Sequence, residues 1–156
     1  MKLIREPLFK GACGPMVHIN GQMFPEFPIE FSLSWLNIVP VWEHQVPPHA
    51  HPHDQIFIFL GGDPKNFFDT DFELSFWYGE EGNRDKIVID TPSLLYIPRG
   101  TLHAPMEWKK VDKPILYGMI YLGPVRTLSR GLPSPPVELK RYMPEEIKLL
   151  KMGKLP

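Results

Sequence analysis

The residues best suited to chemistry are three histidines at alternate positions, His49, His51 and His53, followed by Gln55. On a regular β-strand, alternate side chains face the same side, so these four would share one face. Imidazoles crowded on an inward face are costly unless something organises them, and neutral imidazole is the commonest nitrogen ligand of divalent metals. The spacing therefore indicates a site for a divalent cation.

A second segment, Pro98-Arg99-Gly100-Thr101-Leu102-His103, places another histidine just after a tight turn. The turn follows residues 93–97 (SLLYI), which are predicted to form a buried strand. An antiparallel barrel can bring the end of that strand beside the first histidine cluster. We therefore expect His103 to join the same site.

These two segments resemble the motifs of the cupin superfamily. The first reads His49-x-His51-x3-Gln55-x6-Gly62, and its string HAHPHDQ is similar to the HxHPHEQ variant of small single-domain cupins. The second reads Pro98-x-Gly100-x2-His103. The resemblance, which covers roughly residues 30–122, implies an all-β fold, the double-stranded β-helix or jelly-roll barrel. It also implies one divalent metal ion (Fe, Mn, Ni or Zn) held by His49, His51, Gln55 and His103.

The chain departs from the family motifs at several positions. His44 and Pro92 stand where leading glycines are usual, and Glu107 replaces a terminal asparagine. Gln55 occupies the position of a metal-binding glutamate. Its amide oxygen can still coordinate a cation but adds no charge, so we expect the metal to be a stronger Lewis acid toward an anionic or carbonyl ligand.

The neighbouring residues receive different predictions. The resemblance does not make His53 a ligand, so we predict that it lines the pocket, where it binds substrate, holds a ligand in place or moves a proton as a catalytic residue. Asp54 is expected to face away, toward solvent or a neighbouring strand. Cys13 is predicted to be a packing residue, because no base stands beside it in sequence.

Short strands separated by turn residues predict a β-sandwich or barrel. The chain contains 19 prolines, which interrupt helices and favour strand ends and turns. We expect an N-terminal arm over residues 1–29, a barrel over 30–122, and a C-terminal wrap with a short helix over 123–156. The predicted elements are one or two strands within 30–43, a buried strand at 56–60, further strands at 73–78, 86–90, 93–97 and 114–122, a hairpin turn at 79–85 and a helix at 144–151.

Composition excludes several functional classes. The 156 residues carry a net charge of −1 with no basic stripe, which argues against nucleic acid as a partner. With the single cysteine Cys13, an internal disulfide is impossible, as suits a reducing cytoplasm. No apolar run approaches the ~20 residues that cross a bilayer, so we expect a cytoplasmic protein with no membrane partner.

Two functions remain open. The first is a metal-dependent enzyme, an isomerase, lyase or dioxygenase, acting on a small oxygenated organic molecule. The alternative is a non-catalytic cupin that binds or senses a sugar or organic acid. The resemblance also implies a homodimer with exchanged N-terminal strands, a role that the stretch before Pro28 would serve.

Overall fold

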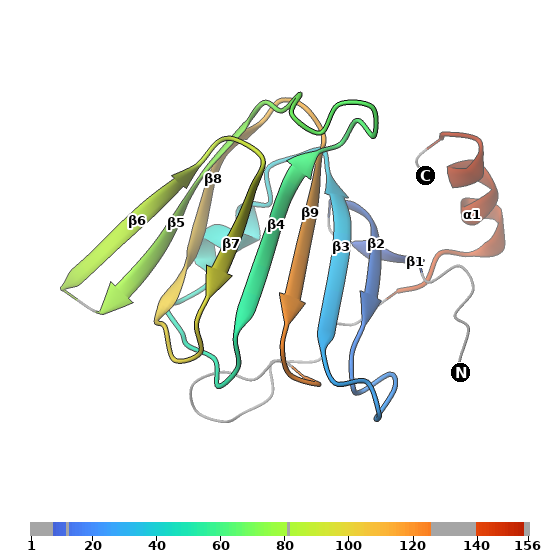
Figure 1. The fold of residues 1–156 in the computed structure, drawn as a ribbon. Helices are drawn as coiled ribbons and strands as arrows, with labels where there is room; N and C mark the ends of the chain where they lie inside the picture. Colours follow the sequence, from blue (N-terminus) through green and yellow to red (C-terminus); the bar gives the residue numbers. More distant parts are fainter. Residues whose placement is uncertain (1–7, 12, 81, 126–139, 155–156) are drawn as a thin grey trace.

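The chain forms two antiparallel β-sheets packed face to face (Figure 1). The computed structural model describes residues 8–11, 13–80, 82–125 and 140–154. One sheet has the strand order β1-β2-β3-β9-β4-β7, and the other has the order β6-β5-β8. The strands in the described ranges are β1 (Leu8–Gly11), β2 (Gly14–Ile19), β3 (Glu30–Leu36), β4 (Gln55–Gly61), β5 (Phe72–Glu80), β6 (Asn83–Ile89), β7 (Ser93–Ile97), β8 (His103–Val111) and β9 (Ile115–Tyr121).

The core between the sheets is dominated by aromatic side chains. Along β4, buried and half-buried residues alternate, so Phe57 and Phe59 point inward. The fully buried ring of Phe59 lies 6.3 Å from that of Phe72 and 6.0 Å from that of Trp108, centroid to centroid. These two partners come from the opposite sheet, so the aromatic contacts join the two layers.

Several predicted elements are confirmed. The strand at 93–97 is β7, and the helix at 144–151 is α1 (Pro144–Lys151). The strand at 114–122 contains β9. The predicted turn at 79–85 is too long, because β5 continues to Glu80 and β6 begins at Asn83. Gly79, with φ of 99°, lets β5 continue through a conformation that other residues rarely adopt.

Two predicted segments contain less strand than expected, in each case beside a proline. Of the one or two strands predicted within 30–43 the structure has β3, which ends at Leu36, and a 3₁₀ helix, η1 (Val41–Gln45), follows Pro40. The buried strand predicted at 56–60 is confirmed as β4, but the histidine run before it is not regular strand, because β4 begins only at Gln55 and residues 50–54 are irregular. Pro52 has no N–H to donate to a strand ladder, which explains the late start.

Three strands were not predicted. β1 and β2 lie in the expected N-terminal arm, and β2 pairs with β3 of the same chain, which extends the larger sheet. β8 was not predicted because it contains Pro105 and ends in two lysines. The alternation of its buried residues Met106 and Trp108 is therefore hard to recognise in the sequence.

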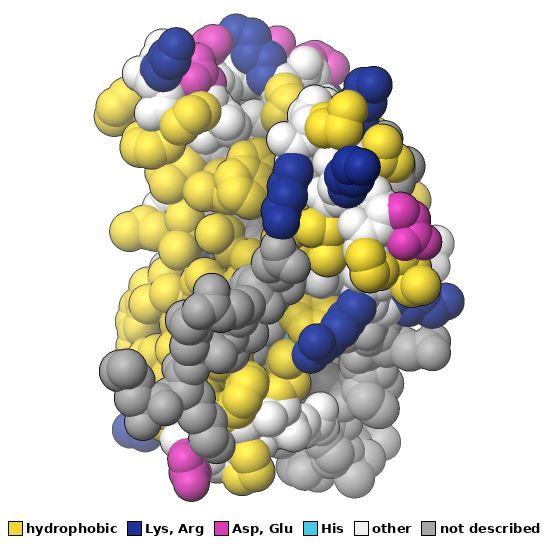
Figure 2. All heavy atoms as spheres, turned by 90° about the vertical axis from the view of Figure 1, so that its right-hand side faces the viewer, with side chains coloured by type: hydrophobic (Ala, Val, Ile, Leu, Met, Phe, Trp, Pro, Cys, Tyr) yellow, Lys and Arg dark blue, Asp and Glu magenta, His cyan; other side chains and the backbone are white. Residues whose placement is uncertain are grey.

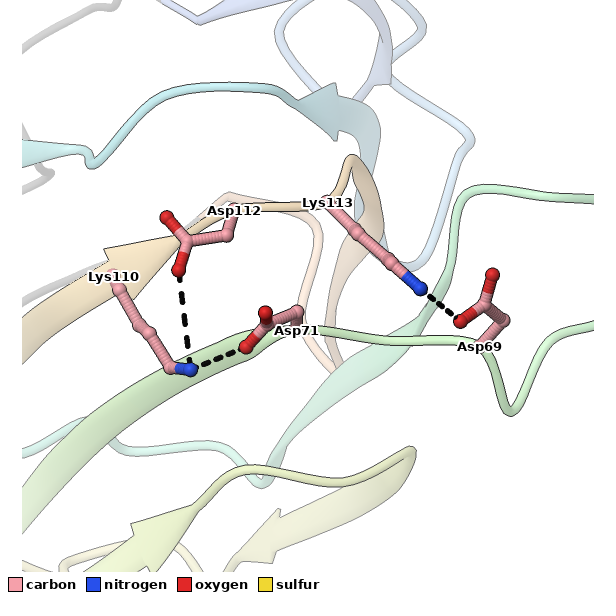
Figure 3. Close-up of polar contacts among 5 residues, drawn as sticks. All are labelled: Asp69, Asp71, Lys110, Asp112 and Lys113. Carbon is pink, nitrogen blue, oxygen red and sulfur yellow. Dashed lines mark hydrogen bonds and ion pairs between the residues drawn. The ribbon is translucent and has the colours of Figure 1, made fainter.

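The far end of the smaller sheet carries exposed ion pairs (Figure 3). Lys110 binds Asp71 and lies 3.9 Å from Asp112, and Lys113 binds Asp69. The hydrogen bond with Asp71 raises the pKa of Lys110. These pairs join the end of β8 to the segment before β5, at the end of β8 opposite His103, and exposed pairs of this kind add little stability individually.

The α-helix lies beside β1, at the right of Figure 1. Lys10 of β1 donates to the Glu146 carboxylate of α1 at 2.5 Å. Within the described ranges, no helix is long and apolar enough to cross a membrane.

Candidate metal centre

Three histidines come together at one end of the barrel. Atoms of His49, His51 and His103 that can bind a metal all lie within 4.8 Å of one another. Their ring centroids are 4.6 to 5.2 Å apart. His51 and His103 are buried and His49 is half-buried. With metal–nitrogen bonds of about 2.0–2.1 Å, one ion can reach all three after a small adjustment.

Backbone hydrogen bonds join the two histidine segments. His49 and His103 form an isolated antiparallel bridge, in which each N–H donates to the other carbonyl at 2.9 Å. The N–H of Gly100 donates to the carbonyl of His51 at 2.8 Å. The turn at residues 98–100 therefore brings His103 beside the first cluster, as expected from the sequence.

Hydrogen bonds fix the orientation of two of the imidazoles. Nδ1 of His49 lies 2.8 Å from the carbonyl of Pro47, and Nδ1 of His103 lies 2.8 Å from that of Thr101. A carbonyl oxygen only accepts, so each Nδ1 carries the proton and donates it. In each ring Nε2 is then the unprotonated nitrogen, which is the form in which histidine ligates a metal.

Gln55 supplies a candidate fourth donor. It is the first residue of β4 and only 2% exposed, and within the described residues its buried Oε1 accepts no hydrogen bond. A buried polar oxygen without a donor costs free energy unless another group satisfies it. Amide oxygens bind hard and borderline cations, so this donor set fits a divalent ion.

His53 lies outside this group. It is exposed, and it stands in the irregular segment before β4, so the expectation of one regular strand face is wrong for this residue. Its ring meets that of Tyr121 edge-on at 5.5 Å, and Tyr121 also contacts His51 at 5.3 Å. The side chain also packs closely over Gly123, where an added Cβ would lie 2.6 Å from the His53 Cδ2.

Asp54 holds the histidine segment in place. Its carboxylate accepts hydrogen bonds from the Tyr96 hydroxyl at 2.9 Å and from the backbone N–H of Arg99 at 2.8 Å, and these bonds lower its pKa. Its own carbonyl accepts from the N–H of Leu122 at 2.9 Å. The outward orientation was predicted, but this positioning role was not.

The wall beside the histidines is aromatic. The Phe76 ring stacks on the imidazole of His103, with centroids 5.9 Å apart and planes 17° from parallel. Tyr78 is the strand partner of His103, and its hydroxyl lies 3.4 Å from a carboxylate oxygen of Asp85. Neither Phe76 nor Tyr78 was singled out from the sequence as a site residue. Phe76 and Tyr78 stand at alternate positions of β5 and so share one face of the strand, which is the sequence signal that could have placed both beside the site.

Comparison with known proteins finds likeness at the level of structure. No family model and no curated protein matches the chain. The solved structure of oxalate decarboxylase from Bacillus subtilis at pH 4.6 is 13% identical with a TM-score of 0.50, over 79% of this chain and 28% of that one. A Lactobacillus farciminis oxalate decarboxylase–formate complex is 12% identical with a TM-score of 0.49, over 77% and 32%. A recombinant oxalate oxidase in complex with glycolate is 14% identical with a TM-score of 0.47, over 76% and 56%.

This chain matches only about a third of the length of the two decarboxylases. At such low identity the likeness concerns the fold. The Bacillus subtilis decarboxylase is a cupin, and its likeness agrees with the two facing antiparallel sheets described above. The chain therefore has the cupin fold, the jelly-roll barrel that its two histidine motifs predict.

Proposed function

We propose that the barrel binds one divalent metal ion through His49, His51, His103 and Gln55, and that it is a metal-dependent enzyme acting on a small organic acid or a related oxygenated molecule. The observation that carries the proposal is the group of three histidines within 4.8 Å. The hydrogen bonds that place the proton on Nδ1 of His49 and His103, and the buried oxygen of Gln55, support it.

The donor set indicates the kind of substrate. Three neutral imidazoles and one amide carry no negative charge, so they would leave the full charge of the ion to attract an anionic or carbonyl oxygen. Fe, Mn and Ni accept more than four ligands, which leaves positions for such an oxygen beside the protein donors. When bound, the ion supplies Lewis acidity that polarises the substrate oxygen.

The residues around the site would perform the other tasks. Phe76 and Tyr121 flank the imidazoles of His103 and His51 and keep water from that side. We assign His53 the transfer of a proton at the rim, because histidine is the side chain that most often acts as a general acid or base. His53 is exposed to solvent, and its ring contacts Tyr121, which in turn contacts His51.

The fold comparison supports the substrate class only in general terms. The Bacillus subtilis protein that shares this fold is, by its name, a decarboxylase of oxalate, a small organic acid. One fold carries many chemistries, so the substrate of this chain follows from its own site.

The test is a turnover assay on protein reconstituted separately with Fe(II), Mn, Ni and Zn. Each form is incubated with a panel of small carboxylic, hydroxy and 2-oxo acids, with and without dioxygen, and products are followed by NMR. We expect turnover that depends on one metal and disappears in chelator and in a His49→Ala/His103→Ala variant. Saturable binding by the metal-loaded protein with no turnover of any candidate would instead favour the non-catalytic binding protein.

A further inference from the structure

The backbone is strained at Ala104, the residue directly after the proposed metal ligand His103. Ala104 has φ of 86°, and among the residues that the structure describes it is the only one other than glycine with a positive φ. A residue with a Cβ adopts this left-handed region only at a cost in free energy, and the conformation persists where the surroundings hold it. Strain of this kind is typical of functional sites, so the contacts around Ala104 bear on the metal centre.

The conformation of Ala104 affects how two proposed ligands lie. The peptide group between His103 and Ala104 is planar, so a change in φ at Ala104 moves the His103 carbonyl with it. That carbonyl accepts the hydrogen bond from the N–H of His49 at 2.9 Å. The bond is one half of the bridge that joins the two histidine segments. A change at Ala104 would therefore disturb the placement of His49 beside His103.

The side chain of Arg84 reaches from β6 to the strained residue. A terminal guanidinium nitrogen of Arg84 donates a hydrogen bond to the carbonyl of Ala104 on β8. β5 lies between these two strands, as seen at the left of Figure 1, and its residue opposite Arg84 is Gly79. Directly opposite residues of an antiparallel pair share a face, so the lack of a side chain at Gly79 leaves room for the guanidinium to cross β5.

Arg84 is held more firmly than an ordinary surface cation. The lysine and arginine side chains that face the viewer in Figure 2 stand out from the surface, as charged groups usually do. Arg84 is only half-exposed, and its Nε atom is buried. Its guanidinium carbon lies 5.6 Å from the centre of the Trp77 ring, within the range of a cation–π contact. The ring thus supports the guanidinium that binds Ala104.

We propose that Arg84 is a positioning residue of the metal centre, which holds Ala104 in the left-handed conformation and so keeps His103 beside His49. This inference rests on the proposed function, in which both histidines bind the ion. A hydrogen bond from a charged donor is stronger than one between neutral groups, which suits a contact that holds a strained residue. Without this bond, Ala104 is free to return to a negative φ, which alanine prefers by a factor of about 5 to 30.

The first test is the dissociation constant of Zn(II), measured on untagged protein by competition with a chromogenic chelator. Arg84→Ala should raise this constant by about 5- to 30-fold, because only the fraction with Ala104 in the left-handed conformation binds well. Lys86→Ala is the matched control, because Lys86 is also on β6 and its ammonium lies 5.3 Å from the centre of the same Trp77 ring. It removes the same charge but leaves the bond to Ala104, so the constant should change by less than about twofold.

The substitution Ala104→Gly separates positioning from a general loss of stability. Glycine adopts positive and negative φ about equally readily, so it depends much less on Arg84. The double variant Arg84→Ala/Ala104→Gly should therefore bind Zn(II) within about twofold of the wild type. Circular dichroism checks that every variant folds. A double variant that binds as weakly as Arg84→Ala would overturn the proposal, as would an Arg84→Ala variant that binds as tightly as the control.

A measurement without metal distinguishes this inference from the proposed function. In chelator, amide hydrogen exchange at His49 and His103 reports directly on the bridge between them. We expect both amides to exchange about 5- to 30-fold faster in Arg84→Ala than in the wild type or in Lys86→Ala. A wild type that binds no metal would refute the proposed function and with it the role of His103 as a ligand. A wild type that binds metal, beside an Arg84→Ala variant with unchanged exchange and unchanged affinity, would overturn this inference alone.

Discussion

Replacing Gln55 by leucine should change stability in opposite directions with and without metal. In the metal-free protein, the buried Oε1 of Gln55 has no hydrogen-bond donor among the described residues. Such an oxygen costs about 1–3 kcal/mol, and leucine of similar size removes that cost. We therefore expect the free energy of unfolding in chelator to stay equal or to rise by about 1 kcal/mol, or ~2–4 °C in Tm.

With metal present the sign should reverse. Metal at 100 times its Kd stabilises a protein by about 2.7 kcal/mol. Loss of one ligand should weaken binding by about 100-fold, since even residues that only orient ligands cost 10- to 100-fold. The variant would then gain only ~0.4 kcal/mol from the same metal concentration and would be less stable than the wild type.

The assay is urea unfolding followed by circular dichroism, in chelator and in excess metal. Ser75→Ala is the control, because the Ser75 hydroxyl is also buried without a partner in the described residues but lies on β5. Its effect should be the same in both conditions. If Gln55→Leu destabilises the protein by about 2 kcal/mol equally in both conditions, Oε1 has a structural hydrogen bond and is not a ligand.

Three further predictions concern other residues. Phe59→Ala removes a fully buried ring that contacts both sheets, so the free energy of unfolding should fall by about 3–5 kcal/mol. A loss below about 1 kcal/mol, measured by urea unfolding, would contradict the packing described. Burial, and then the charge of Glu43, raises the pKa of Cys13 to about 11. Iodoacetamide at neutral pH should therefore label this thiol only after the protein unfolds, which mass spectrometry can measure. Rapid labelling of the folded protein would contradict the burial of Cys13. His53→Gln should lower kcat and alter its pH profile while leaving metal content unchanged; loss of metal would make His53 a ligand, and unchanged kinetics would remove it from the mechanism.

The sequence predicted most accurately those elements whose ends are marked by residues within the element or directly beside it. β7 and α1 match their predictions because glycine, proline and charge signals mark their ends. β8 was missed because Pro105 and two lysines interrupt its pattern, and its inward face is recognisable only once β5 lies beside it. Pairing across a sheet is not encoded in any single strand.

The sequence predicted which three histidines come together in the candidate site, but not how the segments that carry them fold. The motifs brought His49, His51 and His103 into one group, and the structure places them together. Regular strand alternation placed His53 with them, whereas Pro52 and the hydrogen bonds of Asp54 make that segment irregular. The bridge between His49 and His103 depends on a contact between distant segments, which spacing alone does not show.

The most direct test of the central claim is elemental analysis of the protein, purified without a metal-affinity tag, beside the His49→Ala/His103→Ala variant. We predict one equivalent of Fe, Mn, Ni or Zn in the wild type and its loss in the variant. A wild type that retains no metal after reconstitution with any of these ions, or a variant that retains the same metal, would contradict the assignment of this histidine cluster as a metal centre.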